Sequence, residues 1–255
     1  RINCNISFMN IFSLLYTEIL WRPLFNGLVF FYNIIPGHDL GVAIIALTVV
    51  IRFILAPLLW KAQAAQKKLA FIQPELKKIQ EKHKGNKEAQ SKALMELYAA
   101  HQVNPFSGCL VLLIQLPILI ALFQVFHSGL DSASLGYVYG FLARPALLHP
   151  ITFGFLDLTH GALWLGAIAA ITQFFQTKLS APPLSPDGTT GGDFAKALQW
   201  QTTYFFPLLI LLWSYSLPAA LTLYWTAMNL FGIIEQLFLQ GYTKKLWIWM
   251  QSKTR

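Results

Sequence analysis

The pattern of hydrophobic positions changes twice along the chain, from apolar stretches to a polar, basic segment and back again. The clearest apolar stretch runs from Leu40 to Leu59 and reads LGVAIIALTVVIRFILAPLL. Twenty residues at about 1.5 Å each give roughly 30 Å, which is the thickness of the hydrocarbon core of a bilayer. The pattern therefore predicts a membrane-spanning helix, in a segment 38–60, and Asp39 stands where it can cap the first turn.

Four further apolar stretches follow, and we predict membrane spans at 104–127, 161–178, 200–217 and 218–240. Asn104 and Pro105 are residue types favoured at the N-cap and at the first position of a helix. The apolar parts of the third and fourth spans are about 15 and 14 residues long, shorter than the roughly 17 that a span normally needs. Short spans imply a locally thinned bilayer or flanking side chains that reach the interface.

The segment before the first span is apolar and aromatic but is interrupted by Glu18, Arg22, Pro23 and Asn26. These interruptions favour a helix that lies in the membrane interface, within an extracytoplasmic region 1–37, with Trp21 at the depth of the headgroups. A sixth span or an uncleaved signal anchor is the competing interpretation.

Between the first two spans, residues 61–103 are polar and basic. Apolar side chains recur there at intervals of three and four, at Leu69, Ile72, Leu76 and Ile79 and again at Leu94, Leu97 and Tyr98. This spacing is typical of two helices with narrow apolar faces, and residues 84–87 form the turn between them. Pro74 should interrupt the first helix. Together the elements predict an all-α integral membrane protein, a five-transmembrane-helix bundle with a cytoplasmic antiparallel helical hairpin and an N-terminal interfacial helix.

Composition and charge support this prediction. Hydrophobic residues make up 55% of the chain and charged residues 12%, a balance that a soluble domain of this size would not tolerate. Nine of the 19 Lys and Arg residues fall in 61–103, which makes the hairpin cytoplasmic, as are the loop 179–199 and the basic tail 241–255. The segment 128–160, with Arg144 as its one fixed positive charge, is predicted outside, as is the N-terminus.

The lysines of the hairpin are candidates for binding a partner. They are Lys77, Lys78, Lys82, Lys84 and Lys87. A solvated helix face, or attraction to the anionic headgroups of the phospholipid bilayer, accounts for the same charges. Contact with a ribosome is the other interpretation, and the pattern favours no specific nucleic-acid site.

Arg52 is the one charged residue in the stretch from Leu40 to Leu59. Burying it in the bilayer costs on the order of 2.5 to 3.5 kcal/mol, because a guanidinium does not lose its proton. Its side chain could extend toward the interface near Lys61, or it could face a water-filled cavity inside the bundle.

Polar residues on four of the five spans bear on this choice. The candidate residues of a groove are Arg52, Thr48, Gln115, Gln173, Gln176, Thr222, Tyr224, Trp225 and Asn229. Each one alone is explained by a hydrogen bond between helices. The spans offer only one acidic candidate for pairing with Arg52, which is Glu235 near one end of the last span. An arginine without a fixed counter-charge, together with polar residues on four spans, indicates a hydrophilic cavity.

Several stretches of the chain resemble the YidC-type membrane protein insertases, relatives of the Oxa-type insertases of mitochondria and thylakoids. They are WRPLFNGLVFFYNIIPGHDLGVAII from Trp21, IRFILAPL from Ile51, QPELKKIQEKHKGNKE from Gln73, VNPFSGCLVLLIQLPILIALFQVF from Val103 and LPAALTLYWTAMNLF from Leu217. Their order and spacing cover residues 21–240. The resemblance implies a five-helix core, a cytoplasmic hairpin, and a positively charged groove open to the cytoplasm and to lipid.

The resemblance also implies roles for single residues. The arginine of the family's groove corresponds to Arg52, and the polar position one turn earlier corresponds to Thr48. The aromatic position of the last span corresponds to Trp225. The glutamine of the third span corresponds to Gln173 or to Gln176.

The function implied by the resemblance is insertion of nascent membrane proteins in the plasma membrane of a bacterium. Short polar flanks of these substrates would cross through the groove while hydrophobic segments enter the bilayer; a ribosome and a Sec-type translocon are candidate further partners. We expect no catalytic residue, metal or cofactor, since the chain has no ATP-binding G-x-x-x-x-G-K-[ST] run and no hydrolase G-x-S-x-G. A folding and assembly chaperone without insertase activity is an alternative, and so is a small secondary transporter, although inverted repeats are not apparent.

Overall fold

A computed structural model describes residues 13–104, 107–127, 132–181, 197 and 199–253. Helices account for most of them. The elements, in order, are the π-helix η1 (Thr17–Trp21), α2 (Arg22–Ile34), α3 (Leu40–Phe71), α4 (Gln73–Lys82), α5 (Lys87–Ala100), α6 (Ser107–His127), the 3-10 helix η2 (Ser132–Tyr137), β1 (Ile151–Thr152), β2 (Leu156–Asp157), α7 (Leu163–Ser180), the π-helix η3 (Gln201–Phe205), α9 (Phe206–Trp213) and α10 (Ala219–Lys253).

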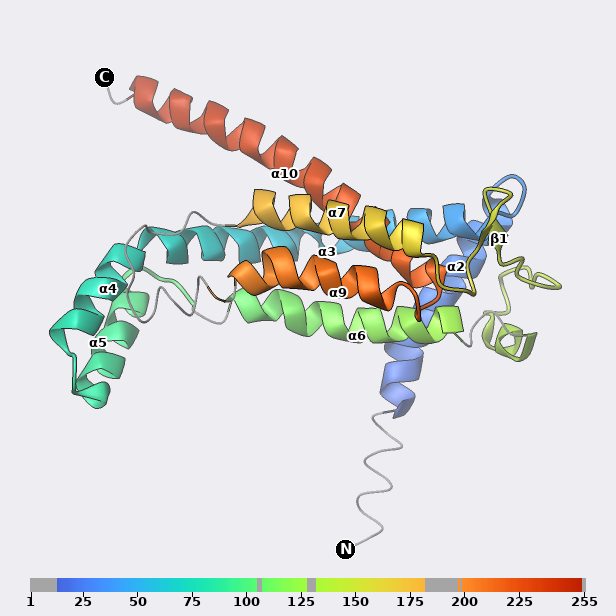
Figure 1. Cartoon of the computed structure of the whole chain (residues 1–255), viewed down its shortest axis with the longest axis horizontal. Helices are drawn as coiled ribbons and strands as arrows, with labels where there is room; N and C mark the ends of the chain where they lie inside the picture. The colour runs from blue at the N-terminus through green and yellow to red at the C-terminus, as the bar shows by residue number, and fades with distance from the viewer. Residues whose placement is uncertain (1–12, 105–106, 128–131, 182–196, 198, 254–255) are drawn as a thin grey trace, which may run out of the picture.

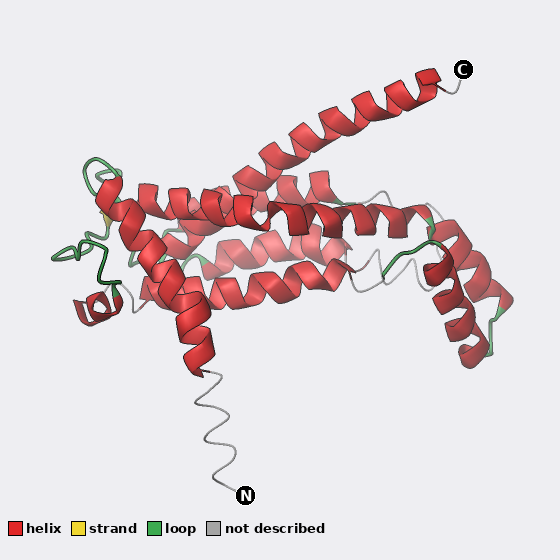
Figure 2. Cartoon of the chain, turned by 180° about the vertical axis from the view of Figure 1, so that it is seen from behind, coloured by secondary structure: helices red, strands yellow, loops and turns green. Residues whose placement is uncertain are grey.

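The helices α3, α6, α7 and α10 and the shorter α9 lie side by side as a bundle (Figures 1 and 2). Helix α10 contacts both α7 and α3, α7 contacts α9, and α3 contacts α6. Within the described residues, one helix segment is long and apolar enough to cross a membrane by length and composition, Leu40–Gln66. Two shorter apolar helices, Leu113–His127 and Gln201–Trp213, accompany it.

The best-packed core lies where α2, α3 and α6 meet. Phe25 and Leu28 of α2, Ile44 of α3, and Leu122 and Phe126 of α6 are almost fully buried there. Elsewhere the bundle leaves large apolar side chains uncovered.

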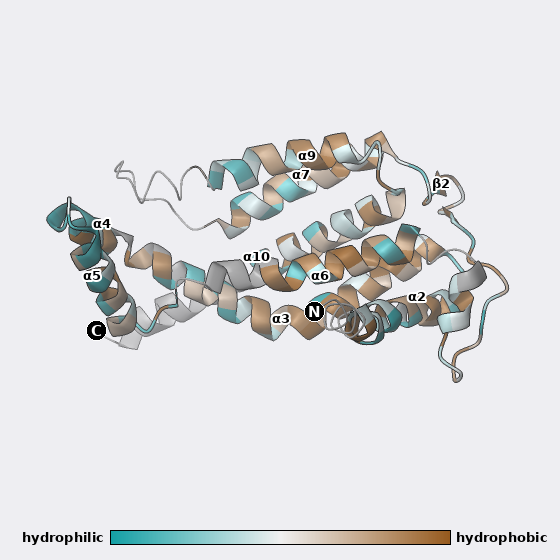
Figure 3. Ribbon diagram, turned by 90° about the horizontal axis from the view of Figure 1, so that it is seen from below, coloured by the Kyte–Doolittle hydropathy of each residue, from teal (hydrophilic) through white to brown (hydrophobic). Residues whose placement is uncertain are grey.

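On α3, Phe53 and Ile54 are 65% and 70% exposed. The ribbon of the bundle is correspondingly coloured as hydrophobic over much of its length (Figure 3). Soluble monomers rarely expose apolar surface on this scale, so the outer surface of the bundle is suited to lipid.

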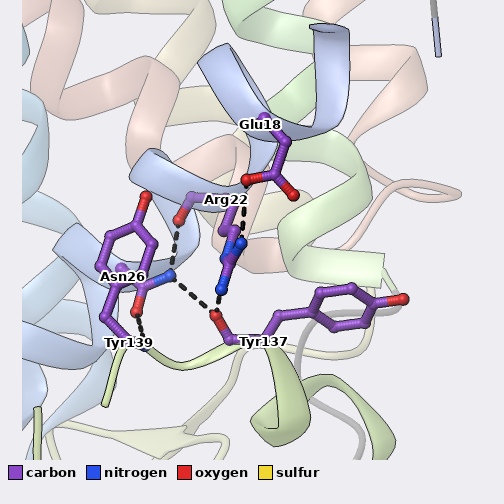
Figure 4. A network of polar contacts seen from close by, with 5 residues as sticks. All are labelled: Glu18, Arg22, Asn26, Tyr137 and Tyr139. Carbon is purple, nitrogen blue, oxygen red and sulfur yellow. Dashed lines mark hydrogen bonds and ion pairs between the residues drawn. The ribbon is translucent and has the colours of Figure 1, made fainter. Parts of the chain in front are cut away.

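Helix α2 crosses the bundle steeply, near the end where β1 lies (Figure 1). The polar residues that interrupt its apolar sequence hold the loop after η2 (Figure 4). Arg22 pairs with Glu18 at 2.8 Å and donates a second hydrogen bond to the carbonyl oxygen of Tyr137. Asn26 donates to the same carbonyl, and its side-chain oxygen accepts from the backbone N–H of Tyr139 at 2.7 Å. The interruptions therefore fasten α2 to the segment that precedes the β-strands.

Helices α4 and α5 contact each other at the opposite end of the bundle and carry mostly hydrophilic residues (Figure 3). Pro74 stands in the first turn of α4, where its missing N–H breaks no helical hydrogen bond, so it begins a helix directly after α3 ends at Phe71. Asn86 caps α5 by accepting from the N–H of Ala89. His101 lies 3.2 Å from the carboxylate of Glu75, which joins the end of α5 to the start of α4.

Two features differ from the sequence-based expectations. A short antiparallel β-ribbon, β1–β2, lies within the segment 128–160, where the periodicity gave no sign of strands. Helix α10 does not end near residue 240 but runs to Lys253. The described part of α6 begins at Ser107, and the expectation that Pro105 takes the first helical position falls outside the described residues.

Candidate functional site

One face of α10 carries a row of residues that meets α7 and α3. The row consists of Trp225, Asn229, Gly232 and Gln236, at intervals of four, three and four, which places them on one side of a helix. Because α7 and α3 are the helices that α10 contacts most extensively, this face is the place where the predicted groove residues can meet.

Around Trp225 and Tyr224, the site contains three hydrogen bonds between side chains. The indole N–H of Trp225 donates to the side-chain oxygen of Gln173 on α7 at 3.1 Å, and the amide nitrogen of Gln173 donates to Thr177 at 3.0 Å. Next to Trp225 on α10, the hydroxyl of Tyr224 accepts a hydrogen bond from Gln115 of α6 at 2.9 Å. These contacts join α10 to α7 and to α6.

One turn further along α10, Asn229 is 1% exposed. Its amide nitrogen lies 3.3 Å from the carbonyl oxygen of Ala169 and 3.4 Å from the hydroxyl of Thr172, both on α7. A buried amide needs such partners, since an unpaired one costs about 1–3 kcal/mol. Asn229 therefore acts as a polar contact between two helices.

Arg52 reaches α10 from α3. Its Nη2 donates to the backbone carbonyl oxygen of Met228 at 3.0 Å, and its guanidinium carbon lies 6.0 Å from the centre of the Phe231 ring. The Nε of Arg52 is buried and has no hydrogen-bond partner among the described residues. A guanidinium has five N–H donors, so this one keeps unused capacity for an acceptor.

Gly232 makes room for Arg52. A Cβ atom at this position would lie 3.1 Å from Nη2 of Arg52, 3.1 Å from Cγ of Gln176 and 3.4 Å from Nε2 of Gln176. Gln176 is therefore the glutamine of α7 that lies beside Arg52 and Gly232, whereas Gln173 is bonded to Trp225. Sequence reasoning missed Gly232; a glycine in register with Trp225 and Asn229 was the available signal.

Glu235 does not pair with Arg52. Its carboxylate accepts a hydrogen bond from the indole N–H of Trp60 on α3, and no ion pair joins it to Arg52 in the described part of the chain. One residue later, Gln236 donates to the side-chain oxygen of Gln63 at 2.6 Å. Trp60, Gln63 and Gln236 were also missed from the sequence, because their roles depend on how α3 and α10 are paired.

Two predicted groove residues lie apart from these contacts between helices. Thr48 is buried and its hydroxyl donates to the carbonyl oxygen of Ile44 in its own helix. Thr222 is buried, and its carbonyl oxygen accepts from the hydroxyl of Thr226 one turn later. Sharing a face with Arg52 or Asn229 was therefore not sufficient for a contact with either.

The hairpin lysines are separate from this site, at the far end of the molecule. Lys78, Lys82, Lys84 and Lys87 are exposed and Lys77 is half-buried. At the base of the hairpin lies a pocket of about 390 Å³, lined by Lys68, Phe71, Ile72, His101 and Val103.

Comparison with known proteins identifies the family. The family model described as "60Kd inner membrane protein" matches residues 30–245. Membrane protein insertase YidC of Fusobacterium nucleatum is 35% identical over 201 residues, which cover 79% of this chain and 86% of that protein. Membrane protein insertase YidC 2 of Bacillus anthracis is 31% identical over 233 residues, covering 89% of this chain and 82% of that protein.

A longer relative matches as well. Membrane protein insertase YidC of Rickettsia canadensis is 29% identical over 232 residues, which cover 88% of this chain but 39% of that protein. The resemblance carried by the stretches between Trp21 and Phe231 is thus confirmed across most of the chain. The chain belongs to the 60Kd inner membrane protein family, the family of the YidC-type membrane protein insertases.

Proposed function

We propose that this chain is a membrane protein insertase of a bacterial plasma membrane, in which Arg52 attracts the acidic or polar flank of a substrate into the bundle. One observation carries the proposal. Arg52 is partly buried on an apolar helix, donates to a single backbone carbonyl, and has a buried Nε without a partner in the described residues. An arginine in this condition is suited to receive a carboxylate, which can accept two parallel N–H bonds from it.

The membrane arrangement belongs to the proposal. The five spans are α3, α6, α7, η3 with α9, and α10; the hairpin α4–α5 is cytoplasmic and the β-ribbon is outside. Helix α7 has 18 residues, about 27 Å, and the helix Gln201–Trp213 is about 20 Å long, both short against a hydrocarbon core of about 30 Å. Short spans thin the bilayer locally and shorten the path of a polar flank.

In the mechanism, the substrate reaches the hairpin, and its short flank enters beside α10, where Arg52, Gln176 and Gly232 meet. The hydrophobic part of the substrate moves into lipid between α7 and α10. This step requires the contacts of Trp225 and Asn229 with α7 to open. Trp225 makes one hydrogen bond to α7 and Asn229 has two partners there, and water could replace each of these contacts. Nascent membrane proteins and the bilayer are the partners that this mechanism needs; a ribosome or a Sec-type translocon is not required for it.

The test is insertion of a single-span substrate, with one Asp in its short N-terminal flank, into liposomes that contain the purified protein. Arg52→Lys should retain insertion because it retains the charge, and Arg52→Ala should abolish most of it. Arg144→Ala removes one positive charge from the external segment and serves as the matched control, with insertion unchanged. Thermal unfolding in detergent checks that each variant is folded.

Two outcomes would contradict the proposal. Equal insertion by Arg52→Ala and the unchanged protein would remove Arg52 from the mechanism. The unchanged protein could also prevent aggregation of the substrate while the substrate flank stays open to external protease. This outcome would favour the assembly chaperone.

A further inference from the structure

The β-ribbon presents its turn in a constrained backbone conformation. Ile151 pairs with Asp157 and Thr152 with Leu156, and Phe153 and Gly154 form the connection, with φ angles of +53° and +79°. Phenylalanine rarely adopts a positive φ, so contacts elsewhere must hold the turn in place. Such outliers justify a search for a function of the turn.

Asp39 holds the turn against the start of α3. Its carboxylate accepts from the hydroxyl of Thr152 and, at 2.8 Å, from the backbone N–H of Phe153, and it also caps α3 by accepting from the N–H of Val42 at 3.0 Å. Gly41 permits this approach, because a Cβ there would lie 2.2 Å from the hydroxyl oxygen of Thr152. The β-ribbon is therefore fixed at the level of the first turn of α3.

Aromatic side chains continue from the β-ribbon to α7. Phe153 is 46% exposed, Phe155 is 72% exposed, and Trp164 in the first turn of α7 is 50% exposed. The ring centres of Phe153 and Phe155 are 6.5 Å apart, and those of Phe155 and Trp164 are 6.1 Å apart. These three side chains, the aromatic strip, join the first turns of two apolar helices.

The level of the aromatic strip identifies what it contacts. Leu40, directly after Asp39, begins the helix segment that is long and apolar enough to span a membrane. The β-ribbon is held at the first turn of this helix, so it lies at the boundary between water and hydrocarbon, where aromatic side chains are the favoured residues. The nearby polar side chains of Asp157 and His160 are hydrogen-bonded to each other and to Thr159. Their mutual pairing leaves the aromatic strip as the feature available to the bilayer.

We infer that the aromatic strip formed by Phe153, Phe155 and Trp164 is an anchor that inserts into the interface of the outer leaflet and fixes the depth of α3. Arg52 lies twelve residues after Leu40, about 18 Å along the helix. An anchor at the first turn thus also sets the depth of Arg52 in the bilayer. The inference rests on the membrane arrangement given under the proposed function, with the β-ribbon outside, but it concerns contact with lipid and does not depend on the insertase activity itself.

The experiment measures the depth of a probe beside the strip, in the whole chain 1–255 with Cys4 and Cys109 replaced. Ile151→Cys, labelled with the fluorophore NBD, places the probe at an exposed position and leaves all three aromatic side chains intact. Lys84→Cys in the turn between α4 and α5 carries the same label as the control in water. The protein is reconstituted in phosphatidylcholine vesicles with or without lipid that bears a doxyl quencher at carbon 5 of the acyl chain.

The emission maximum of the probe at 151 should lie at shorter wavelength than that of the probe at 84. The quencher should reduce the emission intensity of the probe at 151 at least twofold and leave the intensity of the probe at 84 unchanged. Adding Phe155→Ser should reverse at least half of the quenching at 151. Equal emission at both positions would overturn the inference. A blue-shifted probe that lipid does not quench would also overturn it, because protein rather than lipid would then cover the strip.

Discussion

Gly232 decides how closely α10 can approach Arg52 and Gln176. Glycine lowers the stability of a helix in water. At this position the lack of a side chain leaves space for the guanidinium of Arg52 and the amide of Gln176. Arg52, Gln176 and Gly232 come from three different helices, so the role of each depends on the other two.

We predict that Gly232→Ala lowers insertion of a substrate with an acidic flank without unfolding the protein. The added methyl group would displace Arg52 or Gln176 from a preferred rotamer, at about 1 kcal/mol, or roughly a fivefold lower rate. Insertion into liposomes measures the effect. Leu230→Ala, at an exposed position of the same helix, is the control. A rate for Gly232→Ala equal to that of the control would show that the space beside Arg52 has no role.

A second residue-scale prediction concerns Asp157. Hydrogen bonds from the hydroxyl and the backbone N–H of Thr159, with a further contribution from His160, hold the pKa of Asp157 below its ordinary value, although partial burial opposes them. A carboxyl group with a lowered pKa stabilises the fold above its ordinary pKa of about 4, and this contribution is lost as the pH falls through the lowered value.

A spin label at Ile151→Cys reports this loss, since Ile151 pairs with Asp157 in the β-ribbon. Its mobility should rise when the pH falls below about 4. Thr159→Val removes one donor and should move the midpoint of this change upward. A midpoint that Thr159→Val leaves in place would mean that the label follows another group.

At the scale of elements, the sequence predicts those helices whose signals are local. Neighbouring residues were enough to predict the helix from Leu40, its cap Asp39, the turn before Lys87 and the break near Pro74. In the structure α3 begins at Leu40 with Asp39 as its cap, α4 begins beside Pro74, and α5 begins at Lys87. The β-ribbon could not be predicted in this way, because two-residue strands have no periodicity and depend on the distant Asp39.

The contacts between helices could not be predicted from neighbouring residues either. The sequence offered Glu235 as the partner of Arg52, yet the carboxylate binds Trp60, and Met228 supplies a backbone carbonyl for Arg52. A backbone acceptor leaves no trace in the amino-acid pattern. The choice between Gln173 and Gln176 likewise required the rotation of α7 relative to α10.

The bond between Trp60 and Glu235 yields a prediction for the contact between α3 and α10. Trp60→Phe should lower the free energy of unfolding by about 1–3 kcal/mol, because it leaves a buried acceptor without its donor. Unfolding in detergent with increasing denaturant measures the loss. In the Glu235→Gln background the same substitution should cost less, since an amide can donate as well as accept. An equal cost in both backgrounds would assign the effect to lost packing of the indole.

For the whole molecule, the two longest helices differ from the others in reach. Helices α3 and α10 contain 32 and 35 residues, about 48 and 53 Å, and both extend well beyond α7 and the helix Gln201–Trp213. A bilayer of one thickness cannot match the long helices and the short helices at the same time. Under the proposed function, it thins around the short helices, on the side where α10 and α7 meet near Arg52.

This arrangement predicts that a membrane potential, positive outside, accelerates insertion of acidic flanks. Moving one negative charge outward gains about 2.3 kcal/mol per 100 mV. A substrate with one Asp in its flank should therefore insert faster when a potassium gradient with valinomycin sets this polarity in the liposomes, and a substrate with Asn at that position should show no acceleration. Equal acceleration of both substrates would mean that the potential acts on the protein itself. Loss of the acceleration in Arg52→Lys would also contradict the mechanism, because the potential acts on the charge of the substrate and the variant retains the positive group that admits it.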